Sequence, residues 1–288
     1  MLTINQLQVK YGELTALQIT KPITFERGER IGVIGSNGAG KSTLIKALLG
    51  LIPYEGRIST DVKPEQMAVH MQFNHYASTM AVKYIMEALL NASIKKDKKL
   101  RELIDFFDFG QCLNKRFDVL SGGQKQKFTI IMVMYQEAEL TFYDEVTSGL
   151  DFENRQRLMD KLTEWYRDKR DTLVVVSHYY EELEHLVDKL LILDEGRVVA
   201  YGSRQELFET YCGKVVYILD NNPKNREIAS GFSAIKAPGH LIALSCRSLE
   251  AEQKLVSSLV EAGANFKRSN SDIEIMYINA KEKFYGRA

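Results

Sequence analysis

Apolar and polar positions alternate along the start of the chain and then give way to a glycine-rich turn. Leu2, Ile4, Leu7 and Val9 fall on roughly alternate positions, which predicts a half-buried strand. Apolar residues at positions 19, 23 and 25 continue this pattern. The run at 30–34 is short and almost continuously apolar, as expected of a strand buried on both faces.

From Lys41 the apolar spacing becomes helical, and Gly50 stands at the expected end of that helix. Residues 56–72 are typical of a strand, a turn and a second strand. Residues 79–137 contain no proline and have long apolar periodicities, which predicts a mostly helical region. Beyond it we expect strands at 140–143 and 173–176, and a hairpin formed by 190–193 and 197–200 around the turn 194–196.

The pattern changes around residues 211–214. A strand is predicted at 215–219, followed by a polar segment with Asn221, Asn222, Pro223 and Asn225 that is typical of a loop. A strand at 240–246, an amphipathic helix at 249–262 and a further element at 272–278 then indicate a small α+β domain. The chain is thus expected to divide into residues 1–212 and residues 213–288.

Composition limits the class of protein. The chain has 288 residues, with 38 basic and 38 acidic side chains, so its formal net charge is zero and it is not expected to bind nucleic acid. No apolar run approaches the roughly 20 residues needed to span a bilayer, and the first residues do not resemble a signal peptide. We therefore expect a cytoplasmic protein. Cys112, Cys212 and Cys246 are far apart, which favours reduced and mostly buried thiols.

A phosphate-binding loop is the most specific motif. Residues 35–42 fit the pattern GxxxxGK[ST] and lie between a predicted strand and a predicted helix, which is the context that the motif requires. Its glycines let backbone N–H groups surround a phosphate, and the helix N-terminus adds partial positive charge. The lysine would bind the β and γ phosphates, and the serine hydroxyl would bind Mg²⁺. The threonine that follows would cap the helix or contact the α phosphate. These residues are Gly35, Ser36, Asn37, Gly38, Ala39, Gly40, Lys41, Ser42 and Thr43.

An acidic pair follows the strand at 140–143. Asp144 would hold Mg²⁺, directly or through water. Glu145 would act as the general base that polarises the attacking water. An acidic pair after a strand is by itself weak evidence for a nucleotide-hydrolysing site. Together with a phosphate loop in the same chain it becomes strong evidence.

A second motif lies about 20 residues before Asp144. It reads Leu120-Ser121-Gly122-Gly123-Gln124 and opens a helical run. A serine and two glycines before a helix form an anion-binding terminus.

With these motifs in this order, residues 1–210 resemble the ATP-binding cassette (ABC) ATPases, whose signature is LSGGQ. The resemblance implies an α/β P-loop NTPase fold, with a RecA-like core, an antiparallel β subdomain and an α-helical subdomain at about 74–137. Residues 213–288 would be the small C-terminal α+β extension. It also implies ATP and Mg²⁺ as cofactors.

The same resemblance assigns further site residues. Tyr11, 24 residues before Gly35, lies where the family stacks an aromatic ring on adenine; otherwise it is a surface tyrosine at a strand end. Gln72 resembles the glutamine that binds Mg²⁺ and senses the γ phosphate, with Gln66 as the competing candidate. Asp151, in Ser148-Gly149-Leu150-Asp151, resembles the loop that communicates across the dimer. His178 resembles the histidine that contacts the γ phosphate and the catalytic glutamate.

The chain departs from the family pattern at a few positions, none of which removes a catalytic group. Val146 replaces the usual proline after the catalytic glutamate, and the region of Ala138 lacks a common proline. Lys127 stands where arginine is frequent. Thr141 and Tyr143 interrupt the otherwise aliphatic strand before Asp144. These changes bear on rate and loop rigidity.

The family resemblance implies partners. The signature of one subunit would close over the ATP held by a second copy or a homologous subunit, and integral membrane permease subunits would hold the pair at the inner face of the cell membrane. Residues 73–90 would receive the coupling segment of the permease, and residues 79–84 resemble that region in exporter ATPases.

We expect the ATPase of a bacterial exporter of drugs, antimicrobial peptides or self-immunity substrates. The alternatives are an importer ATPase with a regulatory tail, a soluble ABC ATPase acting on ribosomes or DNA, and a regulator that binds nucleotide without hydrolysis. For the tail, a packing or dimer-supporting extension and a ligand-sensing domain both remain open.

Overall fold

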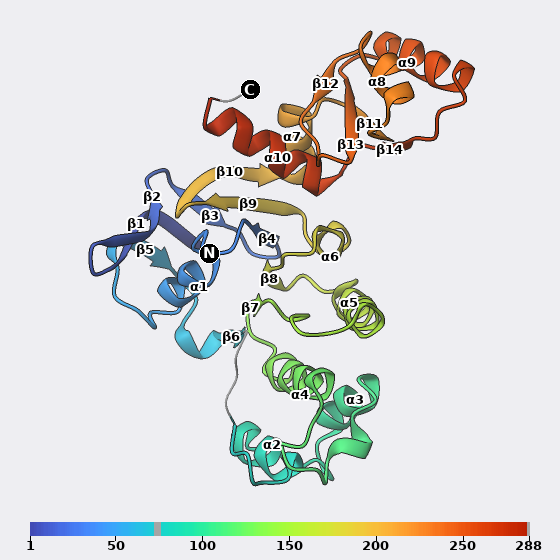
Figure 1. The fold of residues 1–288 in the computed structure, drawn as a ribbon. Helices are drawn as coiled ribbons and strands as arrows, with labels where there is room; N and C mark the ends of the chain where they lie inside the picture. Colours follow the sequence, from blue (N-terminus) through green and yellow to red (C-terminus); the bar gives the residue numbers. More distant parts are fainter. Residues whose placement is uncertain (72–75, 287–288) are drawn as a thin grey trace.

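The computed structural model describes residues 1–71 and 76–286 and contains one large mixed sheet and one small sheet (Figure 1). Four strands of the large sheet form an antiparallel region in which β1 pairs with each of the other three. They are β1 (Leu2–Tyr11), β2 (Leu14–Ile19), β3 (Ile23–Phe25) and β5 (Glu55–Thr60). The alternating apolar residues of β1 are buried, as the sequence pattern predicted.

The parallel part of the sheet has the order β9-β4-β8-β7-β6. β10 pairs antiparallel with β9 and touches β2, which joins the two regions. Because the carboxyl ends of neighbouring parallel strands meet at one edge, the loops after β4, β7 and β8 lie together. The strands are β4 (Arg30–Ile34), β6 (Met67–His70), β7 (Leu140–Asp144), β8 (Thr172–Val176), β9 (Lys189–Asp194) and β10 (Arg197–Ser203).

Helices cover both faces of this sheet. On one face α1 (Lys41–Leu48) buries Leu44, Ile45 and Leu48 against the strands. On the other face lie α5 (Phe152–Tyr166), α6 (Tyr180–Glu184) and α7 (Arg204–Tyr211).

A helical region extends from the β6–β7 edge (Figure 1). It holds α2 (Val82–Leu90), α3 (Lys98–Phe106) and α4 (Gly122–Tyr135), which confirms the helical character expected for residues 79–137. Short 3₁₀ turns at Pro64–Gln66 and Gly110–Cys112 complete the elements of the first 212 residues. The ring of Phe128 packs against Tyr76, Phe109 and Phe117 and anchors α4 to its neighbours.

The C-terminal region forms an antiparallel sheet of order β12-β13-β11-β14. Helices α8 and α9 cover one face, and α10 passes between the other face and β10 (Figure 1). The elements are β11 (Val215–Asp220), α8 (Pro223–Ala229), β12 (Ala234–Ile235), β13 (Leu241–Cys246), α9 (Leu249–Glu261), β14 (Lys267–Ser269) and α10 (Ile273–Phe284).

One expectation for this region is wrong. The polar segment after β11 was predicted as a loop, but Pro223 starts helix α8. Asn222 caps that helix by accepting a hydrogen bond from the Asn225 backbone N–H at 2.9 Å, and proline is well suited to the first helical position. The asparagine-proline pair is therefore a helix start.

Two further observations concern expectations from composition. All three cysteines are free and buried, as predicted. Within residues 1–71 and 76–286, no helix has the length and apolar character needed to cross a membrane.

Candidate functional site

The phosphate loop connects β4 to α1, and close packing explains two of its glycines. A Cβ on Gly35 would lie 2.3 Å from the Leu193 carbonyl oxygen. Gly40 caps α1 with φ of 98°, and a Cβ there would lie 2.9 Å from the Ala16 carbonyl oxygen. Glycine accepts both the close approach and the positive φ. The loop is thus built into the space between β9 and β2.

A cavity of about 460 Å³ lies over the first turn of α1. It brings together residues 37–43 of the phosphate loop with Glu145 and His178, which follow β7 and β8, and Ala16 of β2. Gly35 and Ser36, the first two residues of the loop, do not line the cavity. Three of the four sequence-predicted catalytic residues, Lys41, Glu145 and His178, therefore meet across three neighbouring strand ends.

Lys41 is buried at the base of this loop. Its ammonium group donates hydrogen bonds to the Gly35 carbonyl at 2.9 Å and to the Ser36 carbonyl at 3.1 Å. Burial lowers the pKa of Lys41, and the charges of Glu145 and Asp144 oppose that shift. A desolvated cation next to the cavity is suited to bind a polyanion.

Asp144, at the end of β7, is only 1% exposed. Burial raises the pKa of its carboxyl, and a hydrogen bond from Ser42 opposes the shift. Within the described residues, its Oδ1 atom has no hydrogen-bond partner. A buried carboxylate with an open oxygen beside a serine hydroxyl fits Mg²⁺, which binds through one or two carboxylates and otherwise through phosphate and water oxygens.

Glu145 and His178 both line the cavity and contact each other. Glu145 has a φ of 50°, and its backbone N–H donates to the Val176 carbonyl at 3.0 Å, which turns its side chain toward the next loop. Its carboxylate contacts Nε2 of His178 directly. This pair can accept and hold a proton at the carboxylate.

The signature residues line a different cavity, of about 370 Å³. Ser121 and Gln124 form a reciprocal capping box at the start of α4, with hydrogen bonds of 3.3 and 3.2 Å. Gly122 and Gly123 lie beside them. Asp151, which caps α5 through the Asn154 N–H at 3.0 Å, lines the same cavity. The phosphate-loop and signature cavities share no lining residue.

The candidate for adenine stacking is not among the residues that line the phosphate-loop cavity. Tyr11 lies at the end of β1, where 51% of its surface is exposed, and it does not line the cavity. Gln72 lies outside the described residues. Its competitor Gln66 belongs to the 3₁₀ turn before β6, and its amide donates to the Glu139 carboxylate.

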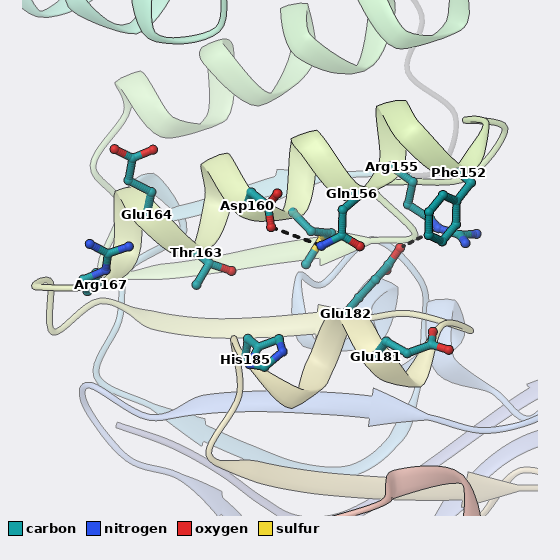
Figure 2. Close-up of a pocket in the computed structure, with 11 residues that line it drawn as sticks. Phe152, Arg155, Gln156, Asp160, Thr163, Glu164, Arg167, Glu181, Glu182 and His185 are labelled. Atoms are coloured by element: carbon teal, nitrogen blue, oxygen red, sulfur yellow. Dashed lines mark hydrogen bonds and ion pairs between the residues drawn. The ribbon is translucent and has the colours of Figure 1, made fainter. Parts of the chain in front are cut away.

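A third cavity, of about 560 Å³, lies between α5 and α6 (Figure 2). It is larger than the other two, but none of the sequence-predicted site residues that the structure describes lines it. At its edge the buried Glu182 accepts a hydrogen bond from the Ser177 hydroxyl at 2.5 Å and lies 3.7 Å from the Arg155 guanidinium. Its lining mixes acidic and basic side chains and includes no residue of the phosphate loop, so this cavity is not the candidate site.

Sequence reasoning missed two residues that contact the site or a direct neighbour of it. Glu182 accepts a hydrogen bond from Ser177, the neighbour of His178. Its position four residues after His178 is the only feature of the sequence that could have indicated this contact. Asp194 accepts a hydrogen bond from the Ser36 hydroxyl at 3.0 Å. Asp194 was placed in a hairpin turn, and no pattern in the sequence indicates its contact with the loop.

Comparison with known proteins agrees with this geometry. A family model described as "ABC transporter" matches residues 21–148. The methionine import ATP-binding protein MetN of Corynebacterium efficiens is 34% identical over 204 residues, covering 65% of this chain and 57% of the relative. The Nod factor export ATP-binding protein I of Rhizobium sp. (strain N33) is 30% identical over 216 residues, which cover 70% of this chain and 71% of the relative.

A third relative matches over most of the chain. The linearmycin resistance ATP-binding protein LnrL of Bacillus subtilis is 26% identical over 286 residues, covering 90% of this chain and 89% of the relative. Against the MetN proteins of Corynebacterium, by contrast, the chain spans less than two thirds of their length.

Solved structures share the fold. The ATP-binding subunit of an ABC transporter aligns with a TM-score of 0.64 at 24% identity, over 73% of this chain and 93% of that one. The α/β cassette fold expected from the sequence is thereby confirmed.

Proposed function

Because this chain belongs to the ATP-binding cassette family of transporter ATPases, we propose that it hydrolyses ATP to power export through separate membrane permease subunits. The observation that carries the proposal is the meeting of the phosphate loop, Glu145 and His178 in one cavity. Asp144 lies buried directly behind them.

ATP binding rests on the loop and its lysine. Backbone N–H groups at the start of α1 and the Lys41 ammonium provide positive charge where the β and γ phosphates would bind. Asp144 and Ser42 would hold Mg²⁺, which would neutralise charge on the phosphate oxygens. Gln72 and the ring of Tyr11 are proposed as an additional metal ligand and as the adenine platform.

Hydrolysis is assigned to the pair of Glu145 and His178. The Glu145 carboxylate would accept the proton of the attacking water. The contact with His178 fixes the position of that carboxylate in the cavity. His178 would then also approach the γ phosphate.

Two subunits would complete each site. The phosphate-loop cavity and the signature cavity lie apart on one chain, although both carry residues suited to the same nucleotide. We propose that Ser121, Gly122, Gly123, Gln124 and Asp151 of one subunit close over ATP held by the phosphate loop of a second subunit.

Export is favoured by the extent of the similarity. The relative named for linearmycin resistance matches across both the cassette and the C-terminal region. The relatives named for methionine import have higher identity, which favours import as the second candidate, but their match covers only 65–69% of this chain. We therefore propose export of a toxic compound, with the protein at the inner face of the membrane.

Substitution of two residues tests the reaction. Glu145→Gln should still bind Mg-ATP, accumulate an ATP-bound dimer, and lose at least about a hundredfold in kcat, as expected when a general base is removed. Lys41→Ala should lose ATP affinity. A matched control is Glu250→Gln, an exposed acid at the start of α9, which should leave turnover unchanged. Turnover of Glu145→Gln equal to that of the unaltered protein would exclude the assigned base.

Deletion of the gene tests the direction. An exporter predicts greater sensitivity to a compound that acts on the cell, restored by the unaltered gene and not by the Glu145→Gln form. An importer predicts slow growth when one nutrient is limiting. Slow growth on a limiting nutrient, without greater sensitivity to any compound, would contradict export and support import.

A further inference from the structure

Asp194 is a buried carboxylate next to the phosphate loop that the reaction described above does not use. It is the last residue of β9, which pairs in parallel with β4, so its backbone ends beside the loop that follows β4. Its side chain is only 5% exposed. A buried carboxylate is stable only when charged or hydrogen-bonding groups surround it.

Two of those groups come from the end of the chain. Helix α10 packs against α7, α6 and β10 and lies along the cassette (Figure 1). From its last turn, Lys281 donates to Asp194 Oδ1 at 2.8 Å. The hydroxyl of Tyr285, just beyond the helix, donates to Asp194 Oδ2 at 3.0 Å.

The third group belongs to the phosphate loop itself. The Ser36 hydroxyl donates to Asp194 Oδ1 at 3.0 Å, while the Ser36 carbonyl accepts from Lys41 at 3.1 Å. Ser36 is therefore held on one side by Asp194 and on the other by the loop lysine. An unbroken chain of polar contacts leads from Lys281 through Asp194 and Ser36 to Lys41.

The backbone supports the same contact independently. At the residue before Ser36, the Gly35 backbone approaches the Leu193 carbonyl so closely that a Cβ there would lie 2.3 Å from the oxygen. The start of the phosphate loop and the end of β9 thus meet in two adjacent places. Movement of Asp194 would be transmitted directly to the loop.

The polar contacts of Lys281 and Tyr285 with Asp194 go beyond the apolar packing of the C-terminal helix. The apolar face of α10 already buries Ile273, Ile275, Met276 and Ala280. Lys281 and Tyr285 add polar contacts beyond that face: both reach Asp194, and the Tyr285 hydroxyl also lies 3.3 Å from the Glu195 carboxylate. Hydrogen bonds to ionised groups are stronger than neutral ones and fix geometry.

We propose that Asp194, fixed by Lys281 and Tyr285, is a positioning residue for Ser36, so that the C-terminal helix forms part of the nucleotide site. This inference rests on the proposed binding of ATP by the phosphate loop. It assigns the tail a role in ATP affinity that neither a simple packing extension nor a ligand sensor requires.

Variants on the last helix of the full-length chain test the proposal. Lys281→Gln and Tyr285→Phe, combined, should raise the Kd for Mg-ATP and the KM by about tenfold with less change in kcat, because a charge-assisted contact is lost behind the loop. Lys281→Arg alone keeps a cation at this position and should have the Mg-ATP affinity of the unaltered chain. The control is Lys283→Gln, since the Lys283 ammonium lies over the Tyr211 ring and not at Asp194.

A double-mutant cycle links the helix to the loop. Ser36→Ala and Lys281→Gln should have non-additive effects on Kd, measured beside thermal unfolding midpoints for every variant. A lower midpoint with unchanged Kd and KM, or additive effects, would overturn the positioning role and leave ATP binding intact. Failure of the unaltered chain to bind ATP would overturn the proposed function, and this inference with it.

Discussion

At the scale of single residues, Glu182 connects the loop that carries His178 to helix α5. It accepts a hydrogen bond from Ser177, and the Ser177 hydroxyl in turn accepts one from the Tyr179 N–H at 2.9 Å. Arg155 pairs with Glu182 and lies over the Tyr179 ring at 3.7 Å. The loop that contains His178 is therefore bound to the start of α5.

Removal of this carboxylate should affect the rate more than affinity. Glu182→Ala frees Ser177 and leaves Arg155 without its partner, so we expect about a tenfold lower kcat with little change in KM, because the base is misplaced. Glu182→Gln keeps the acceptor and should recover most of the rate. Steady-state ATPase kinetics measure this effect, with the exposed neighbour Glu181→Gln as control. An unchanged kcat for the alanine variant would contradict this prediction.

His70 predicts a pH dependence of stability. It is completely buried on β6, and burial lowers its pKa to about 4. The unfolded chain has a histidine pKa near 6.5 and therefore binds the proton first as the pH falls. The free energy of unfolding should thus decrease between about pH 6.5 and 4, by up to about 3 kcal/mol from this residue.

Comparison with His70→Leu isolates this effect from other titrating groups, such as Asp144. Urea unfolding at pH 7, 6 and 5 should give a shallower loss of stability for the variant than for the unaltered protein. Parallel losses in the two proteins would show that His70 does not contribute.

At the scale of elements, Tyr143 explains a departure from the aliphatic pattern expected of the strand before Asp144 and Glu145. Its hydroxyl lies 2.7 Å from the Tyr166 hydroxyl of α5, and both side chains are buried. Burial raises the pKa of both tyrosines, so both stay neutral. The pair joins the strand that ends in Asp144 to the helix that begins after Asp151.

Single and double substitutions should differ in stability. Tyr166→Phe leaves the Tyr143 hydroxyl buried without that partner, and we expect a loss of about 1–3 kcal/mol in the free energy of unfolding. Tyr143→Phe with Tyr166→Phe removes both hydroxyls and should recover part of that loss. Urea denaturation measures the coupling, and strictly additive losses would argue against it.

The elements that could be predicted from sequence are those whose pattern is local. The strand before the phosphate loop and the glycines of that loop lie within a few residues of one another, and the capping Ser121 lies directly before the helix that it caps. Asp194 and Tyr285 are 91 positions apart, and their contact depends on how α10 returns to the cassette. Helix α8 was missed because polar residues that cap a helix resemble those of a loop.

At the scale of the whole molecule, the helical region and the C-terminal sheet lie at opposite ends of the large sheet (Figure 1). The helical end exposes large apolar side chains on and beside α2: Met80 is 44% exposed, Tyr84 52% and Leu89 62%. Met80 and Tyr84 are four residues apart. We propose that the surface around the exposed Met80 and Tyr84 side chains receives the permease.

Charge introduced on that surface should separate docking from chemistry. Tyr84→Glu should reduce recovery of the protein with native membranes by about tenfold or more, because an aromatic contact in an interface is replaced by a charge. ATPase activity of the purified chain should be unchanged, since Tyr84 lies outside both nucleotide cavities. Leu249→Glu is the matched control, because Leu249 is 68% exposed at the opposite end of the molecule. Equal recovery of both variants and the unaltered protein would place the permease contact elsewhere, and joint loss of both would indicate a general effect of added charge.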